Sequence, residues 1–407
     1  MLDITVIFFE IPTMLDEPFK HFTIIAFLSI NAYFGSPLKT NMRAILQIDL
    51  SFSSYKLGIL AFVTAFVVAM ILMPPLIRAI YRFKLFDVPD GRKEHSIPIP
   101  TMGGIASCMG MAVGCVFWFQ YTRDIFIVSF FFSIAVLFAI GMMDDIKNLS
   151  ARYKFAIQIA VALLIAFSGV RITSFNGLFG INELSVSAQY TFTVLVITAI
   201  TNAFNLIDGI DGLAGGLGFM SLVILGIFLT ICGDINIAII AFALSGGLLG
   251  FLYYNFNPAK IFMGDTGSLV LGFVTSVLCI RLIQLNTGIQ FPFLPHAPIF
   301  ALSIVMIPVF DTLRVFGLRI WSGRSPFSPD KNHIHHLLTN NGWSHSLSAK
   351  LLCAVHALIL ILGYFLKDVS LIGGLLILFL VMLLTILVFQ RLKVPERRRK
   401  IQVSSLK

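Results

Sequence analysis

Charged residues are scarce in this chain of 407 residues. Asp, Glu, Lys and Arg together make up 12% of it, whereas about a quarter of the residues in a soluble globular protein are charged. So few charged side chains cannot cover a soluble globule of this length, and 57% of the residues are hydrophobic. The composition therefore excludes a soluble protein and predicts a polytopic protein of the lipid bilayer.

Two further features are missing. The five cysteines lie inside apolar runs and show no CxxC spacing, which excludes a disulfide framework or a zinc ribbon. The N-terminus lacks the positive region of a signal peptide, because acidic residues precede its short apolar run. We therefore expect residues 1–55 to be a poorly ordered extension, or a start site placed too early with Met42 as the natural alternative.

Long apolar runs fill the rest of the chain, and each is near the ~20 residues that a helical membrane span needs. We predict an all-α membrane domain over residues 56–392 with about eleven transmembrane helices, followed by a basic cytoplasmic tail over 393–407. The expected spans are 57–79, 103–121, 125–143, 153–170, 187–206, 213–232, 236–254, 267–285, 298–318, 347–366 and 371–390.

The distribution of Lys and Arg gives the orientation. Counted with their flanks, one set of loops and the C-terminal tail hold twenty of these residues, while the opposite short loops hold Arg123, Arg171 and Lys367. The basic side is predicted to be cytoplasmic. The net charge of +9 thus reflects membrane orientation, and we expect no nucleic-acid partner. The longest opposite loop, 171–185, has the composition of a surface hairpin.

The stretch TNAFNLIDGIDGLAGGLG (201–218) interrupts two apolar runs. Its four polar residues recur every third position, so they cannot share one face of a continuous helix with 3.6 residues per turn. We expect one helix to end near Leu206 and the next to begin after Gly212, with Asp208 and Asp211 in the acidic turn between them. A helix C-terminus favours cations and a helix N-terminus favours phosphate; the alternative is that one aspartate merely caps the second helix.

Two other loops on the same side carry carboxylates. Asp144 and Asp145 end a span at its helix C-terminus, where negative charge is disfavoured, so we expect compensation either by Lys147 or Lys154 or by a substrate that carries Mg²⁺. In FMGDTGS, Asp265 offers a hard oxygen ligand of the kind Mg²⁺ prefers. Alternatively, Asp265 or Thr266 is the N-cap of the following helix.

The last of these loops contains HIHH, with His333, His335 and His336. The motif lacks the i, i+4 histidine pair and the adjacent glutamate of a zinc protease helix. Near a diphosphate the imidazoles could donate hydrogen bonds or carry charge; otherwise they belong to a loop without catalytic function. Asp311 and Arg314, three residues apart, are expected to form a structural ion pair.

Together these loops supply carboxylate and carboxamide oxygens, cations, an aromatic residue and a basic entrance. That set suits Mg²⁺-assisted phosphoryl transfer between a soluble and a lipid-bound partner. A membrane prenyltransferase is one alternative, although it has no use for HIHH or FMGDTGS. A transporter is another, although its carboxylates would lie at mid-membrane.

The combination of DD, NxxNLxDGxDGLA, FMGDTGS and HIHH in this order resembles the polyprenyl-phosphate N-acetylhexosamine-1-phosphate transferase family over about residues 57–390. The muramoyl-pentapeptide branch of this family has a run of consecutive histidines where this chain has HIHH. The motif therefore favours the undecaprenyl-phosphate GlcNAc-1-phosphate transferase branch. The resemblance implies an enzyme of the bacterial inner membrane that transfers N-acetylhexosamine-1-phosphate from a UDP-N-acetylhexosamine to undecaprenyl phosphate. UMP is released and a cell-surface polysaccharide is started; a homodimer is left open.

The resemblance also implies roles for individual residues. The metal ligands would be Asn205 and Asp265, with Mg²⁺ as the ion and Mn²⁺ as the alternative. Asp144 and Asp145 would lie at the lipid phosphate, one of them helping to deprotonate it. Asp208 and Asp211 would shape the surroundings of the nucleotide and metal, with Asp211 near the uracil. Lys154 would contact the diphosphate, and Phe262 would stack on the base. The phosphates or the sugar would be contacted by His333, His335 and His336. We expect direct attack by the lipid phosphate, with a covalent aspartyl intermediate as the alternative.

Overall fold

The computed structural model describes residues 52–83, 99–178, 180–256, 258–287, 293–325 and 332–393. The predicted N-terminal extension and basic tail fall almost wholly outside these residues. Within them the protein is all-α apart from one hairpin, as predicted. The helices are α3 (Phe52–Phe83), α4 (Gly104–Trp118), α5 (Ile125–Lys147), α6 (Ala151–Phe167), α7 (Val186–Ile207), α8 (Leu213–Ile231), α9 (Ile235–Asn255), α10 (Gly264–Thr287), α11 (Ala297–Trp321), α12 (Ile334–Asn340), α13 (His345–Phe365), the 3₁₀ turn η1 (Leu366–Asp368) and α14 (Leu371–Arg391).

Every one of the eleven predicted spans coincides with a helix. Nine of the helices in the described part of the chain are long and apolar enough to cross a membrane. The other two are shorter, with 15 residues in α4 and 17 in α6, and α6 begins with Arg152 and Lys154 inside its first turns. A polytopic membrane protein is therefore confirmed, whereas the number of eleven crossings stays a prediction. The short helix α12 was not predicted.

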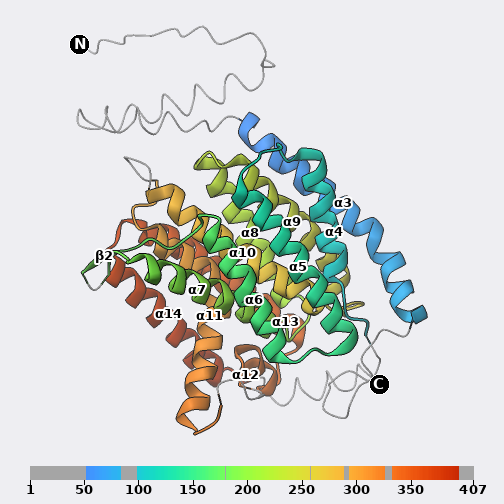
Figure 1. Cartoon of the computed structure of the whole chain (residues 1–407). Coiled ribbons are helices and arrows are strands. Elements are labelled where there is room, and N and C mark those ends of the chain that lie inside the picture. Colours follow the sequence, from blue (N-terminus) through green and yellow to red (C-terminus); the bar gives the residue numbers. More distant parts are fainter. Residues whose placement is uncertain are drawn as a thin grey trace, which may run out of the picture. The chain divides into compact units, whose positions relative to one another are not determined.

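Helix α10 lies in the interior of the bundle, where it packs against α4, α5, α7, α8, α9 and α11 (Figure 1). Of its apolar window 78% is buried, and of that of α9 83%, against 28% for the peripheral helices α3 and α14. The FMGDTGS motif forms the start of α10. The motif is thus held by the centre of the fold rather than by a free loop.

Glycines allow two neighbouring helices to touch the first turn of α10. A Cβ atom on Gly141 of α5 would lie 2.6 Å from the carbonyl oxygen of Asp265, and one on Gly104 of α4 would lie 2.2 Å from Gly267 Cα. Small residues permit this close approach of helix backbones in membrane proteins. The position of Asp265 is therefore fixed by backbone packing on two sides.

The predicted surface hairpin is confirmed. Strands β1 (Ser174–Leu178) and β2 (Ile181–Glu183) pair antiparallel, with Leu178 opposite Ile181. Asn176, Gly177 and Gly180 have positive φ angles, which suits a tight turn because glycine and asparagine adopt this conformation most easily.

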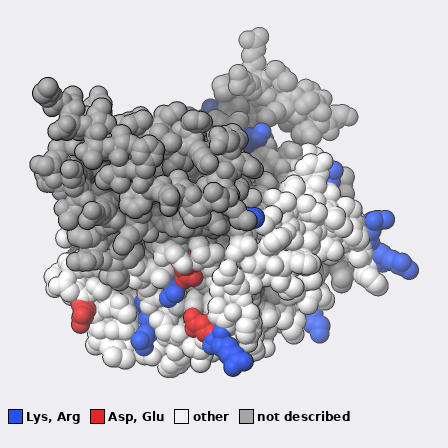
Figure 2. Space-filling view, turned by 90° about the horizontal axis from the view of Figure 1, so that it is seen from above, with Lys and Arg blue, Asp and Glu red and all other residues white. Residues whose placement is uncertain are grey.

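Charged side chains are sparse on the face seen from above (Figure 2). On the described part of that face, Lys, Arg, Asp and Glu stand singly or in small mixed groups among uncharged residues.

Candidate active site

The acidic turn breaks the chain where the sequence predicted. Helix α7 ends at Ile207 and α8 begins at Leu213. Gly212 has a φ of +78°, and its N–H donates to Asn255 Oδ1 at 2.8 Å, which ties the start of α8 to the end of α9. Gly209 leaves space for a histidine ring, because a Cβ atom there would lie 2.5 Å from His335 Nε2.

Asp145 caps α10 from a different helix. Its Oδ1 accepts a hydrogen bond from the Asp265 N–H at 2.8 Å, and its Oδ2 accepts from the N–H and Oγ1 of Thr266 at 3.1 and 2.5 Å. The first N–H groups of a helix have no partner inside the helix, and a negative charge there is favourable. The sequence suggested Asp265 or Thr266 as the N-cap, but the capping carboxylate comes from Asp145 on α5, and it orients the Asp265 backbone.

Lys154 bridges two of the predicted carboxylates. Its Nζ lies 2.7 Å from Asp265 Oδ2 and 3.0 Å from Asp144 Oδ2. The other oxygen of Asp144 accepts from the Leu149 N–H at 2.7 Å. The prediction that a lysine compensates the aspartate pair is confirmed for Lys154, whereas Lys147 is exposed at the end of α5.

Asn205 and Asp265, predicted as metal ligands, are in contact. Asn205 Nδ2 donates to Asp265 Oδ1 and to Ser268 Oγ, both at 2.9 Å. Through Asp265 this pair connects to Lys154 and Asp145. Residues from α5, α6, α7 and α10 thus form one cluster, as the sequence motifs required; Ser268 was quoted as part of FMGDTGS but not predicted to belong to the site.

Asp208 lies at the edge of this cluster, at the C-cap of α7. Burial is the main reason why the pKa of its carboxyl group is raised to about 8. The negative charges of Asp265, Asp145 and Asp211 contribute further. Asp208 is therefore a buried carboxyl group with three other carboxylates nearby.

Asp211 lies in the turn between α7 and α8 and contacts the loop between α9 and α10, which contains Phe262. Asp211 is buried; its Oδ2 accepts a long hydrogen bond of 3.4 Å from the Ala259 N–H, and its Oδ1 is sealed without a partner. The backbone of Phe262 pairs with Pro100 and Gly103. In this arrangement Asp211 supports the loop that presents Phe262, and their predicted contacts with the base stay predictions.

The histidine loop is anchored on α11 by Asp311. The predicted pair with Arg314 is confirmed at 2.8 Å, and Asp311 also accepts from the Ile334 N–H at 2.8 Å and contacts His333 Nδ1 at 2.9 Å. The rings of His333 and His335 stack with centroids 5.9 Å apart. Burial, reinforced by His336, lowers the pKa of His335 to about 3, so this ring is neutral at physiological pH.

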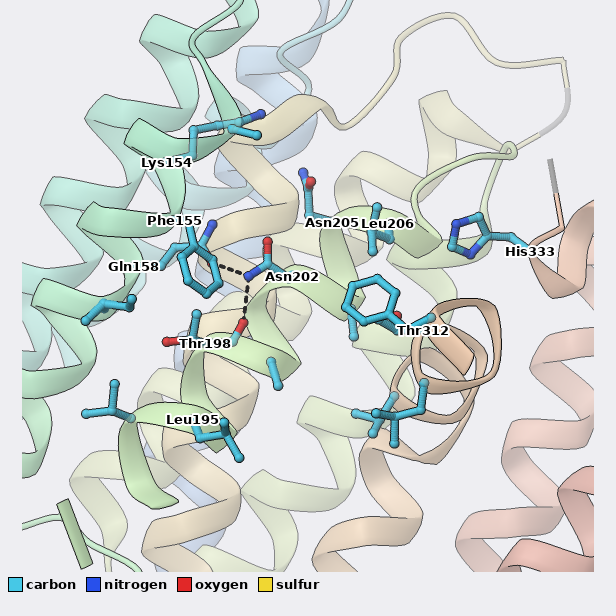
Figure 3. A pocket seen from close by; sticks show the side chains of 18 of the residues that line it. Lys154, Phe155, Gln158, Leu195, Thr198, Asn202, Asn205, Leu206, Thr312 and His333 are labelled. Atoms are coloured by element: carbon cyan, nitrogen blue, oxygen red, sulfur yellow. Dashed lines mark hydrogen bonds between the residues drawn. The ribbon is translucent and has the colours of Figure 1, made fainter. Parts of the chain in front are cut away.

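A groove of about 1020 Å³ runs between α6, α7 and α11 (Figure 3). Its polar end is lined by Lys154, Asn205 and the three histidines, and its other end by Tyr190. Apolar side chains line most of the length between them: Phe155, Ile159, Leu163, Val194, Leu195, Leu206, Val309, Leu313 and Phe316. Asp144 and Asp265 do not line the groove themselves but contact it through Lys154 and Asn205.

The sequence reasoning missed this groove, although a signal was present. Thr198, Asn202 and Asn205 recur at intervals of four and three residues, which places them on one face of a helix, and all three line the groove. On α6, Gln158 follows Lys154 by four residues and does the same. Polar stripes within two apolar spans could therefore have indicated where α6 and α7 face a ligand.

Comparison with known proteins agrees with this architecture. The sequence profile described as glycosyl transferase family 4 matches residues 127–283. A probable undecaprenyl-phosphate N-acetylglucosaminyl 1-phosphate transferase of Bacillus subtilis is 33% identical over 326 residues, which cover 80% of this chain and 89% of the relative. An undecaprenyl-phosphate alpha-N-acetylglucosaminyl 1-phosphate transferase of Escherichia coli K12 is 32% identical, over 69% of this chain and 76% of the relative. A decaprenyl-phosphate N-acetylglucosaminephosphotransferase of Mycolicibacterium smegmatis is 34% identical, over 65% and 71%.

A helical membrane bundle with a carboxylate cluster at the end of an apolar groove, and with such relatives, is a membrane phosphotransferase. More particularly, the chain belongs to glycosyl transferase family 4, in the branch of the polyprenyl-phosphate N-acetylglucosamine-1-phosphate transferases. This assignment sets aside the prenyltransferase and transporter alternatives.

Proposed function

We propose that this protein transfers N-acetylglucosamine-1-phosphate from UDP-GlcNAc to undecaprenyl phosphate at the cytoplasmic face of a bacterial inner membrane. The products are undecaprenyl-diphospho-GlcNAc and UMP, and the lipid product starts a cell-surface polysaccharide. The observation that carries this proposal is the groove, which joins an apolar channel to a polar end formed by Lys154, Asn205 and the histidines.

The groove matches the two parts of a polyprenyl phosphate. From Tyr190 to Asn205 it follows α7 for fifteen residues, or roughly 22 Å at 1.5 Å per residue. The apolar tail of the lipid would pack against this wall, while its phosphate reaches the cationic and carboxamide groups at the polar end. A soluble sugar nucleotide would approach the same end from the aqueous side.

The residues present fit a magnesium ion. Within the described residues no group of three or more His, Cys, Asp and Glu is arranged to hold a metal ion. Mg²⁺, however, typically takes one or two protein oxygens and completes its shell with water and substrate phosphates. Asn205 and Asp265 would supply those oxygens, and a divalent cation would offset the negative charges that lie near Asp208. Bound there, the ion would neutralise charge on the diphosphate and on the departing UMP.

The reaction follows from these positions. A phosphate oxygen of the lipid attacks the β-phosphorus of UDP-GlcNAc, and the bond between that phosphorus and the bridging oxygen breaks, so that UMP leaves. Asp144, next to Lys154 and the groove, is placed to take a proton from the lipid phosphate. Asp145 is occupied by three hydrogen bonds from α10, so its contribution is to hold Asp265. Lys154 turns from the two carboxylates toward the incoming diphosphate.

Purified protein in lipid nanodiscs tests the proposal. Incubation with labelled UDP-GlcNAc, undecaprenyl phosphate and Mg²⁺ should give a labelled lipid and UMP, and omission of the lipid or addition of EDTA should abolish both. Mn²⁺ in place of Mg²⁺ tests the alternative ion. If several UDP-N-acetylhexosamines stay intact under all of these conditions, the proposed function is wrong.

A further inference from the structure

A pair of carboxamides interrupts the apolar wall of the groove. Gln158 on α6 and Asn202 on α7 lie side by side in it, and Asn202 Nδ2 lies 2.7 Å from Gln158 Oε1 and 2.9 Å from the carbonyl oxygen of Thr198 (Figure 3). Both residues line the groove. A polar side chain in an apolar setting is unfavourable unless hydrogen bonds satisfy it, so each atom of this pair needs a partner.

The Thr198 carbonyl fixes which way both amides point. A carbonyl oxygen can only accept, so the atom of Asn202 facing it must be the donor Nδ2. The second hydrogen of that group then points to Gln158, which must present Oε1. This leaves Gln158 Nε2 as a donor and Asn202 Oδ1 as an acceptor.

Neither remaining atom has a hydrogen-bond partner among the residues described, and neither is among the polar atoms that the protein seals from solvent. Gln158 as a whole is only 3% exposed. Its donor is thus directed at the groove by a side chain that is otherwise enclosed. A lipid that fills the groove would displace the water at this donor, and because a buried donor without a partner costs stability, the lipid should supply an acceptor atom at this place.

The position of Gln158 and Asn202 along the groove indicates which ligand atom accepts this hydrogen bond. Gln158 lies four residues beyond Lys154 on α6, about 6 Å along the helix, and Asn202 lies three residues before Asn205 on α7, about 4.5 Å along it. The pair is therefore one helical turn further into the groove than the polar end. A lipid held with its tail in the groove would place the junction between phosphate and hydrocarbon at this level.

We infer that Gln158 Nε2 donates a hydrogen bond to an oxygen of the acceptor's phosphate monoester and that Asn202 is the positioning residue that holds the Gln158 amide in this orientation. The inference rests on the proposed function for the identity of the acceptor. It assigns to the pair the distinction between a phosphorylated lipid and the corresponding alcohol, which has the same tail but no phosphate oxygens.

The test compares two lipids and three variants in nanodiscs. Gln158→Glu keeps the oxygen that Asn202 binds but replaces the donor by an acceptor, so the packing of α6 on α7 is retained. Thr275→Val, a change of nearly equal volume on α10, is the control, since the Thr275 hydroxyl is buried without a partner and Thr275 does not line the groove. Dissociation constants are measured for undecaprenyl phosphate and for undecaprenol.

We expect Gln158→Glu to weaken binding of undecaprenyl phosphate about tenfold or more, as for loss of a hydrogen bond to a charged group, and to leave undecaprenol within about twofold. Asn202→Ala should show the same selective loss, and Thr275→Val should leave the binding of both lipids unchanged. In turnover, the KM for undecaprenyl phosphate should rise while that for UDP-GlcNAc stays the same.

Equal weakening of both lipids would overturn the inference, because it would assign the pair to the tail or to helix packing. A rise confined to the KM for UDP-GlcNAc would overturn it in favour of a contact with the sugar. The binding comparison needs no turnover, so a protein that fails to make the labelled lipid would contradict the proposed function and still decide the role of Gln158.

Discussion

Each carboxylate oxygen of Asp265 is held by a different helix. Oδ1 accepts from Asn205 on α7 and Oδ2 from Lys154 on α6, while Asp145 on α5 holds its backbone N–H. Three helices thus determine where one carboxylate lies. This is the precision that electrostatic catalysis requires, since the charged groups must already be in place when the transition state forms.

Asp265→Ala should therefore abolish transfer without unfolding the protein. The side chain itself caps nothing, because Asp145 supplies the capping oxygens of α10. We expect kcat to fall at least about a hundredfold, as for loss of one preorganised electrostatic group, with an unchanged elution volume in size-exclusion chromatography. Near-normal turnover in this variant would contradict the assignment of Asp265 to the active site.

Asp208 should make stability depend on pH when no metal is present. Its pKa rises from the ordinary 3.8 to about 8 in the folded protein, so the folded state holds this proton more tightly than the unfolded state. The resulting stability is complete below about pH 4 and is lost as the pH rises toward 8. We expect the Tm in EDTA to fall between pH 5 and pH 8 more steeply for the wild type than for Asp208→Asn.

The difference between the two melting curves is the quantity that matters, since other groups titrate equally in both proteins. Asp208→Asn should consequently be the more stable protein at pH 8, although it loses a carboxylate near the reaction. Parallel Tm profiles would show that Asp208 titrates normally.

At the level of the helices, α5 and α10 share one interaction that local sequence does not reveal. FMGDTGS contains two residues that commonly cap helices, Asp and Thr, and a reader of the sequence expects one of them to cap α10. Instead the helix begins at Gly264, whose φ of +72° brings the chain against the Asp145 carboxylate. A Cβ atom on Gly264 would lie 2.6 Å from Asp145 Oδ2.

The two adjacent aspartates should therefore respond differently to the same substitution. Asp145→Asn replaces one accepting oxygen by an amide that faces helix N–H groups, and we expect stability to fall by about 1.5–3 kcal/mol, as for hydrogen bonds to charged groups. Asp144→Asn weakens one ion pair and one backbone contact, so it should lower the Tm less while reducing kcat more. Thermal unfolding and initial rates measured on both variants decide this; equal effects on Tm would contradict the division of roles.

At the level of the whole molecule, the sequence predicts individual helices well and their contacts poorly. Apolar runs of about 20 residues indicate spans directly, and the acidic turn between Ile207 and Leu213 was predicted because polar residues every third position break helical periodicity. The bridge from Lys154 to Asp265 joins residues 111 positions apart. No local pattern specifies such a pair; it follows from how α6 and α10 pack.

The same limit applies to the groove. Asn202 was recognised as part of a motif, but its partner Gln158 lies on a helix 44 residues earlier, and the wall opposite is formed by α11. The groove forms only when α6, α7 and α11, which are distant in sequence, pack together. Motif residues were consequently assigned to the site by resemblance, whereas the apolar groove became evident only in three dimensions.

Orientation in the membrane is the remaining property that the whole chain determines, and it can be tested independently of catalysis. The excess of Lys and Arg predicts that the loop after α11 lies in the cytoplasm and the hairpin of β1 and β2 outside. Arg324→Cys and Glu183→Cys introduce thiols at exposed positions of these two segments. The five native cysteines lie at buried or half-buried positions and should react slowly.

In intact cells, a membrane-impermeant maleimide should label the cysteine at position 183 and leave the one at position 324 unlabelled until the membrane is opened. The reverse pattern would place the carboxylate cluster on the outer face, away from soluble sugar nucleotides. Because Lys154, Asn205 and the histidine loop all lie at the same end of the groove, this single labelling experiment also decides from which side UDP-GlcNAc must reach the lipid phosphate.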